Sequence, residues 1–491
     1  MVAVSAVRWS GLHRWGAVIA VAAALCGCPR PPLPAKTEPP PDAGPKRPTL
    51  FFATNRNVDL LFLIDDSPSM RLSQDNLRRN FPVLMQTLEN LPGGLPNIHV
   101  AVVSSDMGAG DGSVASCNST GGRNGIFQHT ARGDCTASGL ASGATYISNI
   151  AGAANYSGTL PDVFTCIAAL GEAGCGFEHQ FAAITRALGV DGRPVPAENQ
   201  GFLRPDALLA IVMITNEDDC SAVAGVPIFD TGSSTNIESQ LGPPTNFRCN
   251  EFGHFCDGNP PKRRAPNNDV NASVSYENCT SRTTPRFLLP VIDIANQIKS
   301  LKGDDGQIMV AAITGPQEPY VVTWKTPTVA DRSCGAASCP WPQIAHSCMA
   351  ADGSFADPAV RIAELVGQFG ANGRLQSICD DNFAPALSNI ADNIVRYVNA
   401  PCIQGRIAKR PGTTRDDCTV VNSDTGAGVA SCDDTGGAGE CWHVVPGGTG
   451  CSGVSVVVQA DPQGTGDPPG NLTLRCTMCI PGVPDAEVGC P

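Results

Sequence analysis

Four stretches of the chain are almost wholly apolar and lack the polar alternation of a strand that has one face in water. They are rich in Val, Ile, Leu and Ala, and polar or turn-forming residues bound them. Such runs are typical of parallel strands that helices cover on both faces. The predicted strands are Val58–Asp65, Ile98–Asp106, Ala207–Thr215 and Gln307–Gly315.

Amphipathic stretches separate these strands, with apolar residues three or four positions apart, and this spacing predicts helices. Pro82 is expected to kink or interrupt the first of them, and residues 380–382 supply N-cap candidates for the last. The alternation predicts an α/β fold with a doubly wound, mostly parallel sheet flanked by helices. The helical stretches are Leu77–Leu91, Phe181–Leu188, Phe287–Leu301 and Phe383–Tyr397.

The N-terminus has the order of a secretory signal peptide over residues 1–27. Two arginines precede an apolar stretch from Trp15 to Leu25, which is too short to span a membrane. The sequence Leu-Cys-Gly-Cys that follows resembles a bacterial lipobox, which implies that Cys28 is acylated and anchors the protein. Ordinary cleavage with a soluble product is the alternative.

The expected cellular location is the cell envelope of a Gram-negative bacterium. By resemblance to other lipoproteins, Pro29 after the cysteine gives no inner-membrane retention signal, which favours the outer membrane. Residues 28–48 are rich in proline and predict a lipidated, extended linker. No later segment has the roughly 20 apolar residues needed to cross a bilayer.

The chain is acidic, with a net charge of −13 at pH 7. Removal of the signal peptide takes away two arginines and no acids, which leaves −15. This balance argues against nucleic acid and anionic lipid as partners, so contact with a membrane is expected only through the anchor.

The 22 cysteines indicate an exported protein with disulfides. Twelve lie between Cys117 and Cys379, and eight lie from Cys402 to Cys490, which is compatible with two separately stapled units. Only Cys476 and Cys479 have a zinc-like spacing, without a second such pair, so disulfides are favoured over metal binding.

The predicted organisation is therefore a domain over residues 49–401 and a cysteine-rich β module over 402–491. The domain over residues 49–401 contains many more residues than its predicted strands and helices account for. Three Gly-, Pro- and Cys-rich insertions supply the additional residues. They follow predicted strands, at the sheet edge where α/β proteins place ligands, and are expected to set specificity. These insertions lie near residues 107–165, 218–285 and 316–357.

The candidate site begins where the first strand ends, at Asp65, Ser67 and Ser69. A carboxylate and two hydroxyls on one turn can face a single hard cation. The pattern D-x-S-x-S after a hydrophobic strand resembles the metal-ion-dependent adhesion site of von Willebrand factor A (vWA) domains. The alternative is that these side chains only cap the following helix.

The other two loops of that family's site depart from its pattern. The second normally supplies a threonine, which residues 174–178 lack, and the third has Asn216 where an aspartate is usual. An acidic run over residues 217–219 follows, and Asp106 ends the second strand. The predicted cofactor is a divalent cation, Mg²⁺ or Ca²⁺, bound by Asp65, Ser67, Ser69, Asp106, Asn216, Glu217 and Asp219.

Several longer segments resemble cysteine-rich, vWA-containing lipoproteins predicted in myxobacteria and related bacteria. This resemblance implies a surface protein of unassigned function. The segments are DDSPSM, VVSSDMG, GCGFEHQ, NEDDCS and SICDDNFAPAL.

The expected function is binding rather than catalysis. The chain has no H-E-x-x-H, G-x-S-x-G or phosphate-cradling glycine loop. A metal at the sheet edge would leave one position for an acidic side chain of a protein partner, in adhesion or scaffolding. The alternatives are a metal-dependent hydrolase using Asp65, Glu217 and Asp219, and a structural envelope protein with a vestigial site.

Overall fold

The computed structural model describes residues 49–490 with internal gaps. The predicted signal peptide, the proline-rich linker and Cys28 lie outside the described residues. The gaps are 55, 92–93, 111–112, 115–116, 118–119, 134, 136–138, 233–235, 304, 329–330, 332, 334–338, 399–401, 404, 423–424, 437–440, 447–453, 460–471 and 481–483.

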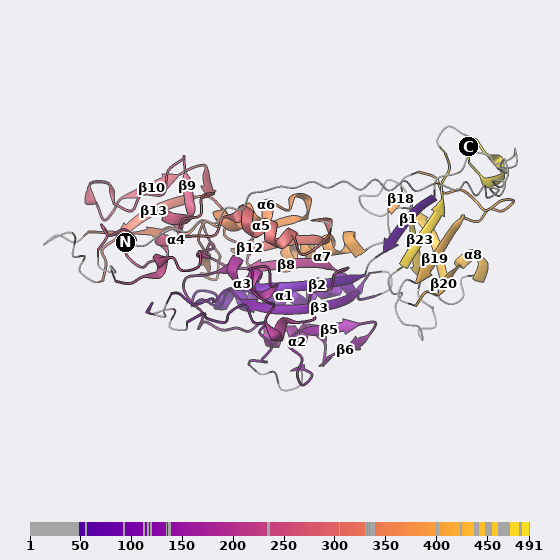
Figure 1. Cartoon of the computed structure of the whole chain (residues 1–491), viewed down its shortest axis with the longest axis horizontal. Helices are drawn as coiled ribbons and strands as arrows, with labels where there is room; N and C mark the ends of the chain where they lie inside the picture. Colours follow the sequence, from indigo (N-terminus) through magenta and orange to yellow (C-terminus); the bar gives the residue numbers. More distant parts are fainter. Residues whose placement is uncertain are drawn as a thin grey trace, which may run out of the picture. The chain divides into compact units, whose positions relative to one another are not determined.

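A seven-stranded sheet forms the centre of the larger domain (Figure 1). Its order is β17-β12-β8-β2-β3-β5-β6, and the pairs from β17 to β3 are parallel, whereas β5 and β6 add an antiparallel edge. The α/β, mostly parallel fold expected from the sequence is confirmed. The strands are β17 (Gly373–Ser377), β12 (Ile308–Thr314), β8 (Leu208–Ile214), β2 (Asn57–Ile64), β3 (Asn97–Ser104), β5 (Ile147–Ile150) and β6 (Ala153–Ala154).

Helices cover both faces of this sheet, which is why its central strands are apolar on both sides. Leu60 and Phe62 pack on one face, and Leu61 and Leu63 on the other, because successive side chains of a strand alternate. One face carries α1 (Arg71–Glu89), α2 (Leu160–Ile167) and α7 (Ala384–Val398); the opposite face carries α3 (Gln180–Ala187), α5 (Val291–Lys299) and α6 (Val360–Gly367).

Of the two effects expected of Pro82, a kink or an interruption, the interruption does not occur: α1 runs from Arg71 to Glu89 with Pro82 inside it. The proline is on the exposed face, where water can reach the carbonyl that its ring leaves without a partner. The opposite face holds fully buried Leu77, Phe81 and Leu84. Burial of that face outweighs the local cost of the proline.

The ends of two other helices follow from local chemistry. α5 begins only at Val291, with Pro290 at the N-cap position, because a proline disfavours helical backbone at the residue before it. At the start of α7, the Ala384 N–H donates to the side-chain oxygen of Asn382 at 2.8 Å, so one of the expected N-cap residues acts there.

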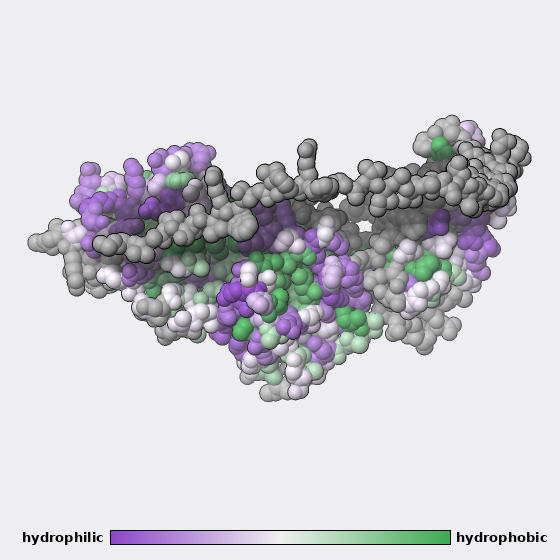
Figure 2. Space-filling model, in the orientation of Figure 1, coloured by the Kyte–Doolittle hydropathy of each residue, from purple (hydrophilic) through white to green (hydrophobic). Residues whose placement is uncertain are grey.

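The long connections of the domain follow β3, β8 and β12 and have ordered elements of their own. Disulfides Cys117–Cys175, Cys135–Cys166, Cys220–Cys249, Cys256–Cys279 and Cys348–Cys379 cross-link them. Figure 2 shows mainly hydrophilic residues over β10 and β13. The elements are β4 (Gly139–Leu140), β7 (Tyr156–Ser157), η1 (Ala197–Asn199), η2 (Pro227–Phe229), α4 (Phe247–Gly253), β9 (His254–Cys256), η3 (Pro266–Asn268), β10 (Ser273–Tyr276), β11 (Cys279–Ser281), η4 (Asp305–Gln307), β13 (Tyr320–Lys325), β14 (Trp341–Ile344), β15 (Cys348–Met349), β16 (Phe355–Ala356) and η6 (Gly370–Asn372).

The C-terminal module is a second seven-stranded sheet, in the order β1-β23-β19-β20-β21-β22-β18. Its disulfides are Cys418–Cys476, Cys432–Cys441 and Cys479–Cys490. The elements are β1 (Thr49–Thr54), β18 (Cys402–Ile403), β19 (Cys418–Asn422), β20 (Gly428–Ser431), α8 (Cys432–Thr435), β21 (Cys441–Pro446), β22 (Val454–Gln459), β23 (Leu472–Thr477) and η7 (Ala486–Val488).

β1 pairs antiparallel with β23 in this second sheet, although residues 49–54 were expected to belong to the larger domain. The strand that opens the parallel sheet is β2, which starts at Asn57. Each of the eight disulfides above joins cysteines within 117–379 or within 418–490. Among the described residues, no helix combines the length and apolarity needed to cross a bilayer.

The aromatic cluster under α1 gives a test of the packing. Phe81 stacks on Phe164 of α2 at 3.6 Å between ring centroids, and both contact Phe62 of β2. We expect Phe81→Ala to lower the free energy of unfolding by about 3–5 kcal/mol, and Phe81→Leu to cost less, in denaturant unfolding of the oxidised protein. A loss below about 1 kcal/mol for Phe81→Ala would contradict this packing.

Candidate functional site

The turn after β2 holds its hydroxyl side chains away from the helix that follows. The Ser67 N–H donates to Asp65 Oδ1 at 2.8 Å, and the hydroxyls of Ser67 and Ser69 are 3.3 Å apart. The N-cap residue of α1 is Met70, which makes no side-chain cap hydrogen bond. The side chains of this turn therefore do not cap α1, which was the alternative to a ligand role.

The end of β8 brings the second part of the site. Thr215 donates its hydroxyl hydrogen to Asp65 Oδ2 at 2.7 Å, and Ser105, after β3, lies 3.3 Å from Oδ1. The side chain of Asn216 faces the Ser69 hydroxyl, with its oxygen at 3.2 Å and its nitrogen at 3.1 Å. Four of the predicted site residues, Asp65, Ser67, Ser69 and Asn216, therefore come together.

A pair of glutamates, Glu178 buried and Glu217 half-buried, lies beside this group. Glu178 precedes α3, in the segment that supplies the second loop, and interacts through a hydrogen bond with Glu217, which follows β8. Asn246 donates its amide hydrogen to Glu217 Oε2. Glu178 is only 2% exposed, and its Oε1 has no hydrogen-bond partner. Glu217 was predicted as a site residue, whereas the role of Glu178 was missed.

Burial dominates the electrostatics of these acids. It raises the pKa of Glu217 to about 8, and the charges of Asp357 and Asp65 act in the same direction. Burial also raises the pKa of Glu178 well above its ordinary value. The charges of Glu217 and Asp65 raise this pKa further. The pKa of Asp65 is raised by burial, although hydrogen bonds from Ser67 and Thr215 oppose the shift.

The remaining acids of the run after β8 hold the fold together. Asp219 Oδ1 accepts from the Phe181 N–H at 2.9 Å, and its Oδ2 accepts from Arg361 at 3.0 Å. Asp219 was predicted as a ligand, but these bonds use its carboxylate to join the starts of α3 and α6.

Asp218 is part of a buried chain of hydrogen bonds that sequence reasoning missed. The Oδ2 atom of Asp218 is 2.8 Å from His254 Nε2 and also accepts from the Arg361 N–H. The other ring nitrogen of His254 is 2.9 Å from the Tyr320 hydroxyl. Burial alone would raise the pKa of Asp218, but His254 and Arg361 outweigh it and lower the pKa. His254 thus links three segments far apart in the sequence.

Asp106 lies in a neighbouring polar cluster. Its Oδ1 accepts from the Gly108 N–H at 2.8 Å, and its charge acts on Asp66. Asp66 binds Arg123 at 3.1 Å, and burial raises its pKa to about 6. The Asp106 N–H donates to the Ser104 hydroxyl oxygen at 2.9 Å. Asp106, predicted as a ligand, thus bonds to residues of its own loop rather than to Ser67 or Ser69 in the hydrogen bonds described here.

The site offers mainly hydroxyl, amide and carboxyl oxygens for a cation. Within the part of the chain that the structure describes, no three His, Cys, Asp or Glu side chains form a group able to hold a metal. A cation would therefore depend on Ser67 and Ser69 together with Asp65, and such oxygen donors suit Mg²⁺ or Ca²⁺. The unpartnered Oε1 of Glu178 supplies a further buried acceptor.

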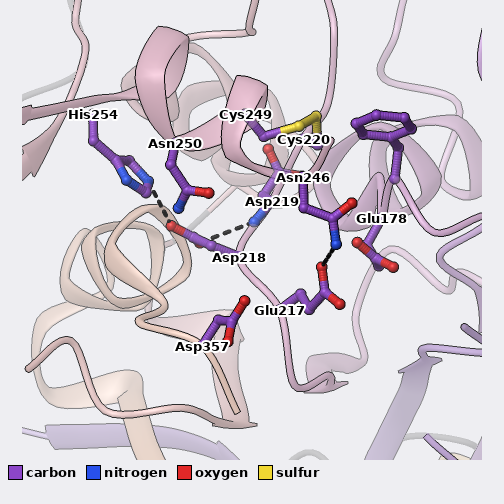
Figure 3. A pocket seen from close by; sticks show the side chains of 11 residues that line it. Glu178, Glu217, Asp218, Asp219, Cys220, Asn246, Cys249, Asn250, His254 and Asp357 are labelled. Carbon is purple, nitrogen blue, oxygen red and sulfur yellow. Dashed lines mark hydrogen bonds and ion pairs between the residues drawn. A yellow bond between two sulfur atoms is a disulfide. The ribbon is translucent and has the colours of Figure 1, made fainter. Parts of the chain in front are cut away.

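A pocket opens beside these residues, with about 330 Å³ of empty space including its mouth (Figure 3). Three lining carboxyls come from different segments: Glu178 before α3, Glu217 after β8 and Asp357 after β16. The ring of His346 lies 2.7 Å from Asp357 Oδ1. The acidic pocket is thus assembled by the folding of three separate loops.

Comparison with known proteins gives distant structural likenesses only. No protein-family model and no curated protein matches the chain. A von Willebrand factor type A protein from Catenulispora acidiphila is similar at 10% identity and a TM-score of 0.28. Three N-terminal domains of the type V pili tip protein Mfa5 from Porphyromonas gingivalis are similar at 12% identity and a TM-score of 0.26. Each likeness covers 88% of this chain and 64% of the other chain. The α/β fold described above rests on the strand order of the sheet.

The raised pKa of Glu217 predicts a pH-dependent effect of its neutralisation. The folded pKa of about 8 exceeds the ordinary 4.5, so the folded state is penalised increasingly as pH rises from about 5 to 8. We expect Glu217→Gln to raise the free energy of unfolding at pH 8 and to change it little at pH 5. Each unit by which the folded pKa exceeds the ordinary pKa corresponds to about 1.4 kcal/mol of free energy between the charged and the neutral form.

Denaturant unfolding at pH 5, 6.5 and 8 in the presence of a chelator measures this effect. Glu277→Gln removes the same charge from an exposed position and serves as the control. An effect of Glu217→Gln that is equal at the three pH values would contradict the buried, repelling environment of this carboxyl.

Proposed function

We propose that this protein binds a protein partner at the carboxyl edge of its central sheet, in adhesion or scaffolding, rather than catalysing a reaction. The observation that carries the proposal is the orientation of Ser67 and Ser69. Their hydroxyls face each other, and that of Ser69 also faces Asn216, instead of capping α1. Hydroxyls gathered in this way at the edge of a vWA-like sheet are suited to recognising an ion or a polar group of a partner.

In the proposed site, a divalent cation is held by Asp65, Ser67 and Ser69, with Asn216 and Glu217 beside them. The cation would supply one coordination position to an acidic side chain of the partner. Thr215 and Ser105 orient the Asp65 carboxylate through their hydrogen bonds. The carboxyl groups of Glu178 and Glu217 lie beside the hydroxyls, and a bound cation would lower their raised pKa values and favour their charged forms.

Asp219 is left out of this ligand set, since Arg361 and the start of α3 occupy its carboxylate. The same bonds leave the hydrolase alternative with only two of its three carboxylates, and we do not propose it.

We also propose that the protein is a lipoprotein of the cell envelope, anchored through Cys28 in the outer membrane. The disulfides of the described residues are typical of exported proteins. The order of charges, apolar residues and cysteines in the N-terminal 28 residues supports acylation.

A cation-binding measurement tests the site. We expect Mn²⁺, Mg²⁺ or Ca²⁺ to raise the melting temperature of the oxidised, chelator-treated protein, by an amount equivalent to about 2.7 kcal/mol at a hundred times the dissociation constant. Ser67→Ala and Ser69→Ala, made together, should abolish the shift without unfolding the protein, because neither hydroxyl caps α1.

The matched control is Ser354→Ala, which removes a partly exposed hydroxyl that donates to Asp352. It should leave the cation-induced shift unchanged. If the parent shows no shift with any of the three cations, the metal-dependent part of the proposal is rejected.

Acylation of the N-terminus is tested by metabolic labelling with palmitate in a Gram-negative host. We expect the parent and Cys26→Ser to incorporate label and to sediment with outer membranes. Cys28→Ser should lose both the label and the membrane association, because the acyl chains provide the anchor. Label retained by Cys28→Ser would refute the assignment of the acylated residue.

A further inference from the structure

Two arginines in the connection after β8 have no acidic partner within the part of the chain that the structure describes. Arg282 directly follows β11, and Arg286 comes after the intervening Thr-Thr-Pro. Neither guanidinium group has an ion pair or a hydrogen bond to a described residue. This is unusual in a chain with 46 acidic and only 33 basic residues. The two arginines therefore present positive charge that the chain itself leaves unpaired.

The backbone on both sides of these arginines is held in place. The Arg282 N–H donates to the Gly253 carbonyl oxygen at 2.7 Å. At the other end, the Phe287 carbonyl oxygen accepts from the Val223 N–H at 2.8 Å. β11 pairs with β9, and the disulfide Cys256–Cys279 cross-links the two strands. The segment that carries the arginines is thus fixed to the rest of the connection.

Aromatic rings orient both guanidinium groups. The guanidinium carbon of Arg282 lies 4.5 Å from the centroid of the Phe255 ring, and that of Arg286 lies 5.2 Å from the centroid of the Phe287 ring. Phe287 is itself buried and packs on Phe252, with 4.5 Å between the ring centroids. An arginine that rests on an aromatic face keeps its N–H groups free for a planar acceptor. Such prior ordering reduces the entropy that binding would otherwise cost.

The electrostatics of Arg282 reflect the proximity of the second arginine. Burial lowers the pKa of Arg282, and the charge of Arg286 lowers it further, whereas Glu251 acts in the opposite direction. Glu251 does not neutralise the pair, because its carboxylate binds Arg263 at 2.8 Å. A guanidinium group keeps its charge at physiological pH in spite of such a shift. In addition, Nε of Arg282 is buried without a hydrogen bond, although a buried donor normally has an acceptor.

We propose that Arg282 and Arg286 together bind carboxylate groups in an acidic segment of the protein partner. The planar donors of a guanidinium group match the two oxygens of a carboxylate. The exposed residues Thr283 and Thr284 lie between the arginines and offer hydroxyl donors to the same segment. This inference rests on the proposed function, because it assumes a protein partner, but it does not require the cation.

The distribution of charge favours a short acidic segment over a nucleic acid or a membrane. Both of these present many phosphates and are bound by extended basic surfaces. In the same connection, Arg263 is paired with Glu251 and Arg264 with Glu238, so these arginines do not extend the free positive charge. The net charge of −13 would repel a long polyanion. Two guanidinium groups are sufficient for one or two carboxylates.

The test measures binding of a short glutamate peptide to the oxidised full chain in the presence of a chelator. The probe is acetyl-Gly-Ser-Glu-Glu-Glu-Ser-Gly-amide with a neutral fluorescent label, and fluorescence anisotropy at about 20 mM salt reports binding. The same peptide with Gln in place of Glu is the uncharged control. We expect the glutamate peptide to bind at least about tenfold more tightly, and its affinity to fall as salt screens the charges.

Variants locate the binding. Arg282→Gln and Arg286→Gln, made together, should weaken the glutamate peptide about tenfold, and each alone by about three- to fivefold, as expected for partly exposed ion pairs. Arg79→Gln with Arg406→Gln removes the same charge from exposed positions outside this connection and should change the affinity little. Arg286→Lys keeps the charge but not the planar donors, and should recover only part of the affinity. All variants should melt cooperatively, since they alter no fully buried side chain.

The outcomes separate this inference from the proposed function. Equal binding of the Gln peptide, equal losses in the two double variants, or tighter binding of inorganic phosphate than of the glutamate peptide would each overturn the arginine site. Failure of the peptide while a divalent cation still raises the melting temperature through Ser67 and Ser69 rejects the arginine site alone. If the cation has no effect but the peptide binds through Arg282 and Arg286, the arginine site stands and the metal-dependent part of the proposed function falls.

Discussion

The site depends on one buried carboxylate, that of Asp65, which is held by donors from the ends of three strands. Ser67 follows β2, Ser105 follows β3 and Thr215 follows β8, and each donates to one of its two oxygens. A carboxyl group without these donors would be costly at full burial. The bonds therefore fix the ends of the strands relative to one another, and with them the positions of Ser69 and Asn216.

The loops above this edge are held by cross-links and buried charges as well as by apolar clusters of their own. The network of Asp218, His254 and Tyr320 joins the connection after β8 to the connection after β12. Asp219 and Arg361 tie the same region to two helices that pack on the sheet. Loops of this length are usually functional or lack fixed structure, and here disulfides and buried ion pairs act together with apolar clusters of the insertions.

Much of the fold was predictable because its signals are local. The four central strands are continuous apolar runs, and α7 has an apolar stripe with Asn382 in place as its cap. The edge strands β5 and β17 were not predicted, since short and partly exposed strands have no continuous apolar run. The continuity of α1 through Pro82 was also missed, because it depends on which side of the helix the proline occupies.

The sequence by itself determined the turn from Asp65 to Ser69 and the acids after β8, since these follow apolar strands directly along the chain. Only the tertiary structure decided which acids face the site. Glu217 points to Glu178, while Asp218 and Asp219 turn to His254 and Arg361, although the three acids are consecutive. The physical reason is that burial forces each carboxyl to find a donor or share a proton, and those partners lie 36 to 143 residues away in the sequence.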